Sequence, residues 1–174
     1  MNSEKEYNKI KLRFDAKTNE LIVCNQELDQ IIGQLVDCKP EERQSMIDRR
    51  KELINLQGLL QDEQKELKKR CDLAYITMYQ ERLNQEQSEL DKLANIAVNE
   101  RLEMDRILKE YQHFINRQGR SGETKESAAE LVRLETAKAQ AMAKSRIARQ
   151  AAERQKIKVK DAQEDLEAAI KSIG

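Results

Sequence analysis

The side chains in this sequence that are best suited to binding chemistry are basic and lie in one stretch. Residues 138–160 contain a single acid, Glu153, and eight bases: Lys138, Lys144, Arg146, Arg149, Arg154, Lys156, Lys158 and Lys160. Clustered bases bind the phosphates of nucleic acids, anionic lipid headgroups or acidic proteins. This basic stretch is therefore the candidate site for an anion or a partner.

The same bases could instead pair with acids inside the molecule. In an antiparallel fold the basic stretch lies opposite residues 81–103, which contain six acids: Glu81, Glu86, Glu89, Asp91, Glu100 and Glu103. No aromatic residue, which could stack on a nucleic-acid base, lies within the basic stretch. The sequence favours internal pairing, with nucleic acid, another protein and a membrane surface as the alternatives.

The cysteines and the single histidine do not suggest a metal site or a catalytic site. Cys24, Cys38 and Cys71 are odd in number and lack paired spacing, which favours reduced thiols, and His113 has no cysteine near it in sequence. Cys24 falls in a run of regularly spaced apolar residues, where we expect a small buried side chain. No Gly-rich phosphate loop, His–Glu helix pair or CxxC motif occurs. We predict a non-enzyme with no catalytic residues, no cofactor and no metal.

The composition is far more polar than that of an average globular domain. Charged residues make up 37% of the 174 positions, against about 25% in average domains, and aromatic residues make up 3%. Such a chain can fill only a thin apolar seam between helices. Lys plus Arg equals Asp plus Glu at 32 each, so the net charge points to no class of partner. Without a run of ~18 apolar residues or a signal-like start, we expect an intracellular protein, or part of a virion or secretion apparatus.

A long helix from about residue 40 to 116 is the element that the rest of the chain is expected to pack on. Its second part has apolar residues at alternating steps of three and four, the heptad pattern of a coiled coil, interrupted only by Glu86 and Glu100. We call the two inward positions of this repeat the seam. The first part has a separate stripe, and a step of two from Ala74 to Ile76 puts the two stripes out of register. This predicts a change of buried face somewhere between Leu67 and Ile76. The two predicted stripes are Met46, Leu53, Leu56, Leu60, Leu67 and Ala74, then Ile76, Tyr79, Leu83, Leu90, Leu93, Ala97, Met104, Ile107, Tyr111 and Phe114.

Two shorter helices, about 3–36 and 124–173, carry matching seams. The predicted seam residues are Tyr7, Ile10, Phe14, Leu21, Cys24, Leu28, Ile31 and Leu35, then Leu131, Leu134, Ala141, Ala148, Ala152, Val159, Ala162, Leu166, Ala169 and Ile173. Pro40 favours a tight turn at 37–40, and Gly119 with Gly122 favours a second break at 117–123. The predicted fold is all-α: an elongated antiparallel coiled coil, a single domain over 1–174, with the N- and C-terminal helices folded back on the two halves of the central one. The turns place Leu56 beside Leu21 or Ile22, and Leu90 beside Ala151 or Ala152.

In general form, a charged chain that folds into coiled-coil hairpins resembles the FliJ and YscO type, which are stalk proteins of flagellar and type III export ATPases. The resemblance covers composition and hairpin habit, and the third helix departs from a simple hairpin. It implies a stalk or adaptor role. We expect a non-enzymatic scaffold or adaptor that binds other proteins or itself, with nucleic-acid regulation as an alternative. Apolar residues off the seam could line such contacts: Leu12, Ile32, Ile47, Ile54, Leu59, Ile147 and Ile170.

Overall fold

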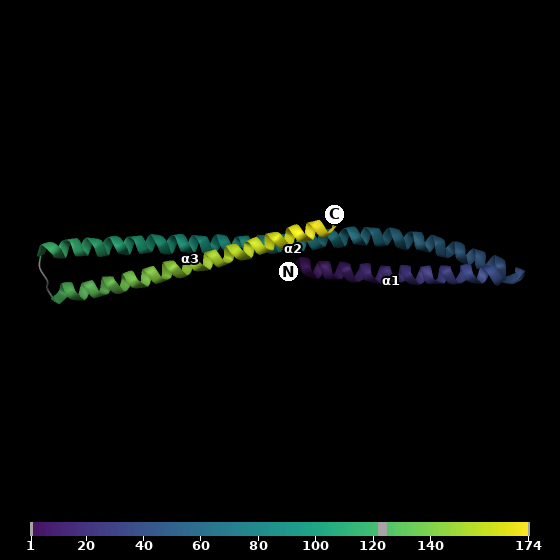
Figure 1. Cartoon of the computed structure of the whole chain (residues 1–174), viewed down its shortest axis with the longest axis horizontal. Coiled ribbons are helices and arrows are strands. Elements are labelled where there is room, and N and C mark those ends of the chain that lie inside the picture. Colours follow the sequence, from purple (N-terminus) through teal and green to yellow (C-terminus); the bar gives the residue numbers. More distant parts are fainter. Residues whose placement is uncertain (1, 122–124, 174) are drawn as a thin grey trace. The chain divides into compact units, whose positions relative to one another are not determined.

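Three helices make up the computed structural model, which describes residues 2–121 and 125–173 (Figure 1). They are α1 (Asn2–Asp37), α2 (Pro40–Ser121) and α3 (Lys125–Ile173), and no strand occurs in the described part. Helices α1 and α3 both pack against α2, which confirms the all-α prediction and its long central helix. Across the described residues, no helical segment combines the length and the apolar character needed to cross a bilayer.

The two ends of α2 differ in how well they match their predicted positions. At its start, Pro40 is the first helical residue, and the amide of Glu42 donates a hydrogen bond of 3.1 Å to the carbonyl of Lys39. At its end, α2 continues to Ser121 rather than stopping near 116, so Gly119 lies within the helix. A glycine costs a helix only about 1 kcal/mol and does not by itself end one. Residues 122–124, where the rest of the break was predicted, lie outside the described residues.

Contacts divide the chain into two compact units. Unit 1 consists of Met1–Glu81 with Ala169–Gly174, and unit 2 is Arg82–Ala168. The single domain expected over 1–174 therefore contains two such units. In unit 1 the first part of α2 packs against α1, and in unit 2 its second part packs against α3.

The seam of unit 1 follows the heptad pattern on α1. Every apolar residue predicted there is buried or half-buried: Tyr7, Ile10, Phe14, Leu21, Cys24, Leu28, Ile31 and Leu35. The core cluster joins two residues of α1, Cys24 and Leu28, to Leu53 and Leu60 of α2. Its centre is Leu53, with only 2% of its surface exposed. A seam one side chain wide is what this polar composition allows.

The prediction that Leu56 lies in the seam is wrong. Leu56 is 44% exposed, and the neighbouring Gln57 occupies the seam and donates a 2.8 Å hydrogen bond to Asn25. One heptad later Gln64 is also half-buried and bonds Thr18 at 2.9 Å. Amides can occupy these positions because the facing helix supplies partners for them, and Leu56 is left on the flank of the seam.

The buried face of α2 changes at one end of unit 1, around residues 71–79, as expected. Between Cys71 and Tyr79 all residues except Leu73 and Thr77 are half-buried, so burial is not confined to one stripe. The ring of Tyr75 lies 5.2 Å from that of Tyr7 and 4.9 Å from that of Tyr79, measured between centroids. Aromatic side chains bury large areas, and this packing contributes to the burial at this end of unit 1.

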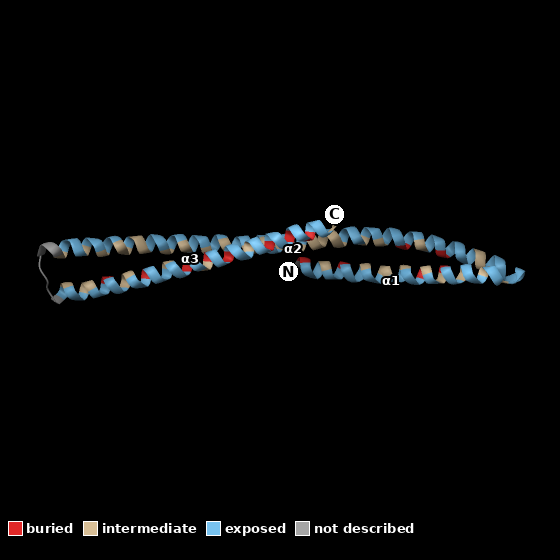
Figure 2. Cartoon of the chain, in the orientation of Figure 1, coloured by how far each residue is buried: buried red, intermediate tan, exposed pale blue. Residues whose placement is uncertain are grey.

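Unit 2 packs large α2 residues against small α3 residues. The predicted α2 seam residues from Leu83 to Phe114 are all half-buried, and the buried α3 residues are Leu134, Ala141, Ala148, Ala152, Ala162 and Leu166 (Figure 2). The two helices run antiparallel, because Arg82 contacts Asp165 while Tyr111, near the other end, contacts Lys138. The polar residue Gln155 is also buried in this seam.

Candidate interaction surfaces

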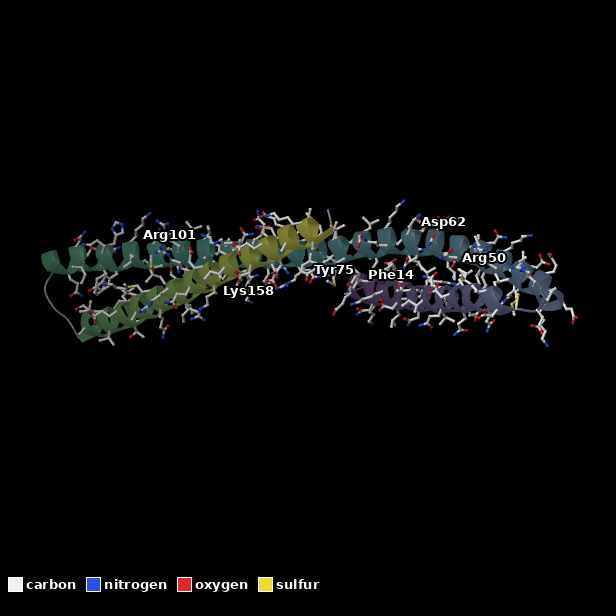
Figure 3. All side chains as sticks on the ribbon, turned by 45° about the vertical axis from the view of Figure 1, so that its right-hand side comes forward. Phe14, Arg50, Asp62, Tyr75, Arg101 and Lys158 are labelled. Atoms are coloured by element: carbon white, nitrogen blue, oxygen red, sulfur yellow. The ribbon has the colours of Figure 1, made fainter. Side chains whose placement is uncertain are left out.

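The basic stretch forms an exposed surface of α3. Alanines at heptad positions are buried, so the other sides of the helix face solvent. Seven of the eight bases in the basic stretch are exposed, and Lys138 is half-buried. Lys158 is one of the exposed side chains drawn as sticks in Figure 3. Most of the candidate residues that the sequence suggested therefore lie on the exposed surface of one helix.

Four of the eight bases have partners within unit 2. Lys138 places its Nζ 4.4 Å from the ring centroid of Tyr111, a cation–π contact that explains a lysine at a seam position. Lys156 pairs with Glu153 at 3.1 Å and Lys160 with Glu164 at 3.4 Å, both within α3. Lys144 contributes to lowering the pKa of Glu103, although the hydrogen bond from Arg106 is the main cause.

The other four bases make no ion pair with any residue that the structure describes: Arg146, Arg149, Arg154 and Lys158. The pairing with α2 that the sequence favoured is therefore absent from these four bases, and Lys156 and Lys160 pair within α3 instead. Among the described residues, an ion pair that joins α2 to α3 has the opposite polarity, with Arg82 on α2 and Asp165 on α3, 2.8 Å apart.

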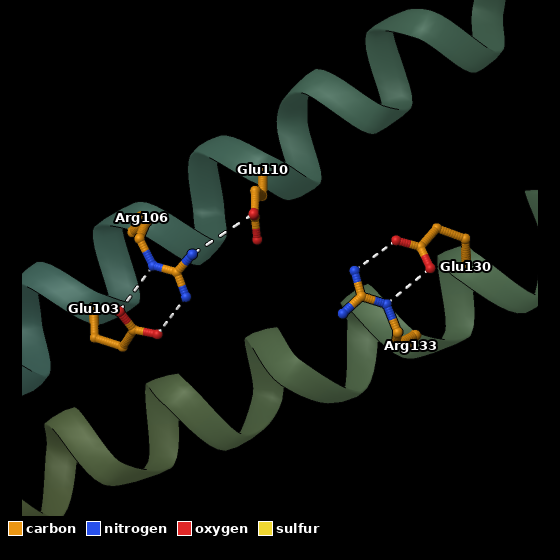
Figure 4. Close-up of polar contacts among 5 residues, drawn as sticks. All are labelled: Glu103, Arg106, Glu110, Glu130 and Arg133. Atoms are coloured by element: carbon orange, nitrogen blue, oxygen red, sulfur yellow. Dashed lines mark hydrogen bonds and ion pairs between the residues drawn. The ribbon is translucent and has the colours of Figure 1, made fainter.

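Several acids of α2 pair with bases on their own helix, which is one reason why the expected pairing with α3 does not form. Glu103 accepts two hydrogen bonds from Arg106, three residues along the same helix, at 2.9 and 2.7 Å (Figure 4). Glu89 pairs with Lys92 at 3.5 Å. Pairs three or four residues apart on one helix form without spanning the gap to a second helix, so acids with such a neighbour are not left for α3.

The far end of unit 2 repeats this local pairing on both helices. Arg106 also reaches Glu110 at 3.6 Å, and on α3 Arg133 donates two hydrogen bonds, of 2.8 and 2.6 Å, to Glu130 (Figure 4). The hydrogen bond from Arg133 lowers the pKa of Glu130 below its usual value. These ion pairs each lie within one helix and do not join α2 to α3.

Exposed isoleucines lie among the unpaired arginines of α3. Ile147 is 66% exposed between Arg146 and Arg149, and Ile157 is 61% exposed. Sequence reasoning had singled out Ile147 but missed Ile157. The heptad register could have revealed it, because Ile157 lies off the seam, two residues from both Gln155 and Val159, and is flanked by Lys156 and Lys158. We call Arg146, Ile147, Arg149, Arg154 and Ile157 the α3 outer face.

A second surface lies on unit 1, in a groove between α1 and α2. Two adjoining hollows of about 440 and 400 Å³ share Ala16 as a lining residue. The apolar lining comprises Ala16, Val23, Leu53, Leu56, Leu60 and Leu67. We call this surface the α1/α2 groove. Leu56, displaced from the seam, is part of its wall.

The cysteines have structural surroundings. Cys24 is 4% exposed and its thiol lies 3.5 Å from the carbonyl oxygen of Leu53, which confirms the expected buried position. Cys38 and Cys71 are half-buried, and all three thiols are free. Comparisons with protein-family models, with curated proteins and with solved structures found no match. The functional argument therefore rests on the α3 outer face and the α1/α2 groove.

Proposed function

We propose that this chain is a non-enzymatic coiled-coil adaptor whose α3 outer face binds an acidic protein partner. The observation that carries the proposal is that Arg146, Arg149 and Arg154 have no ion-pair partner among the described residues and lie beside exposed isoleucines. Cations of this kind attract a partner of opposite charge and orient it. The surrounding seams use their apolar residues to hold helices together, which is what a scaffold requires.

The isoleucines favour a protein over a nucleic acid as the partner. Ile147 and Ile157 gain free energy only if a partner covers their apolar surface. Phosphate backbones offer no such surface, whereas the cores of protein interfaces are apolar and their rims polar. A helix with acidic side chains around a few apolar ones would complement both features of the α3 outer face.

Nucleic-acid binding is the second candidate, and the same unpaired arginines support it. Arginine recognises phosphate oxygens through two parallel hydrogen bonds, which suits an exposed guanidinium group that has no internal partner. The two candidates make different demands on Ile147 and Ile157. A protein interface needs them, whereas binding to phosphates is indifferent to them and weakens steeply as salt rises.

Reversing the charge of two arginines tests the proposal directly. The variant Arg146→Glu with Arg149→Glu is compared with Arg43→Glu plus Arg50→Glu, which changes the same number of exposed arginines on unit 1. A photo-crosslinking amino acid at Gln150, which is exposed between the arginines, records what touches the α3 outer face in cells. We expect a crosslink to an acidic protein that the first variant abolishes and the control variant retains.

Two further measurements separate the alternatives. If the wild-type protein instead binds a labelled DNA or RNA duplex with a steep salt dependence, and the variant Ile147→Ser with Ile157→Ser binds it unchanged, the nucleic-acid function is correct. If the charge reversal removes no binding and only lowers the unfolding temperature measured by circular dichroism, the basic stretch serves the stability of the fold and the adaptor proposal fails.

A further inference from the structure

The α1/α2 groove is an apolar surface that the fold leaves open on unit 1. Its floor is formed by seam residues such as Leu53 and Leu60, and its walls by Val23 and Leu56, which are 53% and 44% exposed. Leu59, 66% exposed, lies one turn from Leu56. Large apolar side chains gathered beside a hollow are a common sign of a contact with another helix.

We infer that the α1/α2 groove binds the same groove of a second copy of this chain, in an antiparallel two-fold arrangement. The inference goes beyond the adaptor function, because it concerns a different helix pair and holds whether or not α3 has a partner. Three properties of the α1 edge support it: the position of a small residue, the order of the charges and one arginine that has no ion pair.

The first property is the spacing of a small and a larger apolar residue. Ala16 and Val23 are seven residues apart, so they lie on the same side of α1 two turns from each other. A two-fold axis midway between them places Val23 of one copy on the partner's Ala16, and the reverse. A projecting valine then fills the hollow that the alanine leaves, as knobs fill holes in coiled coils.

The second property is the order of charges along the edge of the groove. Arg13 and Lys17 lie at one end of this part of α1, and Glu20 and Glu27 at the other. The axis that pairs Ala16 with Val23 brings Arg13 close to the partner's Glu27, so opposite charges meet at both ends. A parallel arrangement would place like charges together, so the charge order selects the antiparallel one.

The internal ion pairs are consistent with this arrangement. Glu20, nearest the axis, is already paired with Lys17 at 2.8 Å, so its approach to the partner's Glu20 is screened. Glu27 pairs with Arg49 at 3.3 Å and keeps a second carboxylate oxygen for another donor. Arg13 makes no ion pair with any part of the chain that the structure describes, so it is available to the partner.

The first test is the oligomeric state and the position of the contact. Light scattering at tens of micromolar protein should give twice the mass of one chain. In a background in which the three native cysteines are replaced by alanine, Asn19→Cys lies near the axis and should form a disulfide between copies under mild oxidation. A mixture of Ala16→Cys and Val23→Cys proteins should form the mixed disulfide in preference to either symmetric one.

The second test uses matched substitutions. Val23→Glu and Leu56→Glu should each raise the dimer dissociation constant ~10-fold or more, because a charge buried in the contact must lose its hydration. Ala16→Leu, which keeps the surface apolar but fills the hollow, should weaken the dimer as well. Leu12→Glu is the control, since Leu12 is exposed but does not line the groove. Helicity measured by circular dichroism should stay unchanged in all four.

Two results would overturn the inference. One is a monomer at every concentration measured. The other is a dimer that forms no Asn19→Cys disulfide and that Val23→Glu and Leu56→Glu leave intact, since its contact would then lie elsewhere. Neither result bears on the α3 outer face, so the proposed adaptor function would remain to be judged by its own experiment.

Discussion

Gln155 on α3 donates two hydrogen bonds to Glu86 on α2, one of 2.6 Å to its carboxylate and one of 3.1 Å to its backbone carbonyl. Both residues interrupt the apolar seams of their helices, and the interruptions meet. Gln155 is only 4% exposed. A polar residue in a seam is tolerated when its partner lies directly opposite, and it then disfavours every register in which the two do not meet.

Replacing Gln155 by alanine should therefore destabilise the fold more than the small number of atoms removed suggests. The change removes both donors, leaves the half-buried Glu86 without this partner, and should cost about 1–3 kcal/mol of unfolding free energy. Urea unfolding followed by circular dichroism at 222 nm measures the cost. Gln150→Ala is the matched control, because Gln150 is exposed on the same helix. An equal loss in both variants would mean that the Gln155–Glu86 contact does not stabilise the seam.

The neighbouring helix positions Leu53 and Leu56 should respond very differently to truncation. Leu53 is 2% exposed in the core of unit 1, so Leu53→Ala should cost about 2–5 kcal/mol, the range for buried leucines. Leu56 is 44% exposed, so Leu56→Ala should cost much less in the folding of one copy. Unfolding at low protein concentration separates this effect from any dimer contact. If the two variants lost equal amounts of unfolding free energy, Leu56 would have to be a buried seam residue like Leu53.

Gly58→Ala should stabilise the protein. A methyl group added at Gly58 would meet nothing within 4 Å apart from its chain neighbours and the nearby backbone of its own helix, so this glycine is not needed for a close helix contact. It lies inside α2, where alanine is favoured over glycine by about 1 kcal/mol. The free energy of unfolding should rise by up to that amount, and Gly33→Ala on α1 should behave alike. A loss of stability would show that α2 is not helical at this position.

The thiol of Cys71 should make stability fall at high pH. Burial, helped by the nearby carboxylate of Asp72, raises the pKa of this thiol above its ordinary value of 9.0. The folded chain then holds the proton more tightly than the unfolded chain. Stability is unaffected below pH 9 and declines as pH rises through the folded pKa.

Unfolding temperatures measured across that range should decline less steeply in Cys71→Ala than in the wild type. A second measurement is the alkylation rate at pH 8, which should be slower for Cys71 in the folded protein than in urea, since the thiolate is the reactive form. Identical pH profiles for the variant and the wild type would assign the decline to other groups, such as Tyr7, whose pKa burial also raises.

Leu90 should lie beside Ala151 or Ala152. The contact between Glu86 and Gln155 sets the register, and one turn further along α2 corresponds to one turn back on the antiparallel α3. Cysteines at position 90 and at 151 or 152, in a background without the native three, should form a disulfide within one chain. A disulfide between two copies at position 90 alone would instead indicate that α2 pairs with another α2.

The sequence alone was sufficient to identify the helices and most of their buried faces. A heptad period determines which side of a helix is apolar, so residues such as Ile10 on α1 and Ala148 on α3 could be assigned to seams without knowing what faces them. Pro40 likewise marks the start of α2 by local backbone geometry. These features depend only on residues close together along the chain.

Only the tertiary structure could decide which polar residues enter the seams and which charges remain unpaired. Leucine looks more suitable for a core than glutamine, yet Gln57 is in the seam and Leu56 is not, because Asn25 on the facing helix accepts its hydrogen bond. Arg146 and Arg149 lack partners because the buried alanines Ala148 and Ala152 face α2, which leaves both arginines on the exposed side of α3. Both outcomes depend on distances between side chains far apart in sequence, and a periodic pattern on one helix does not contain them.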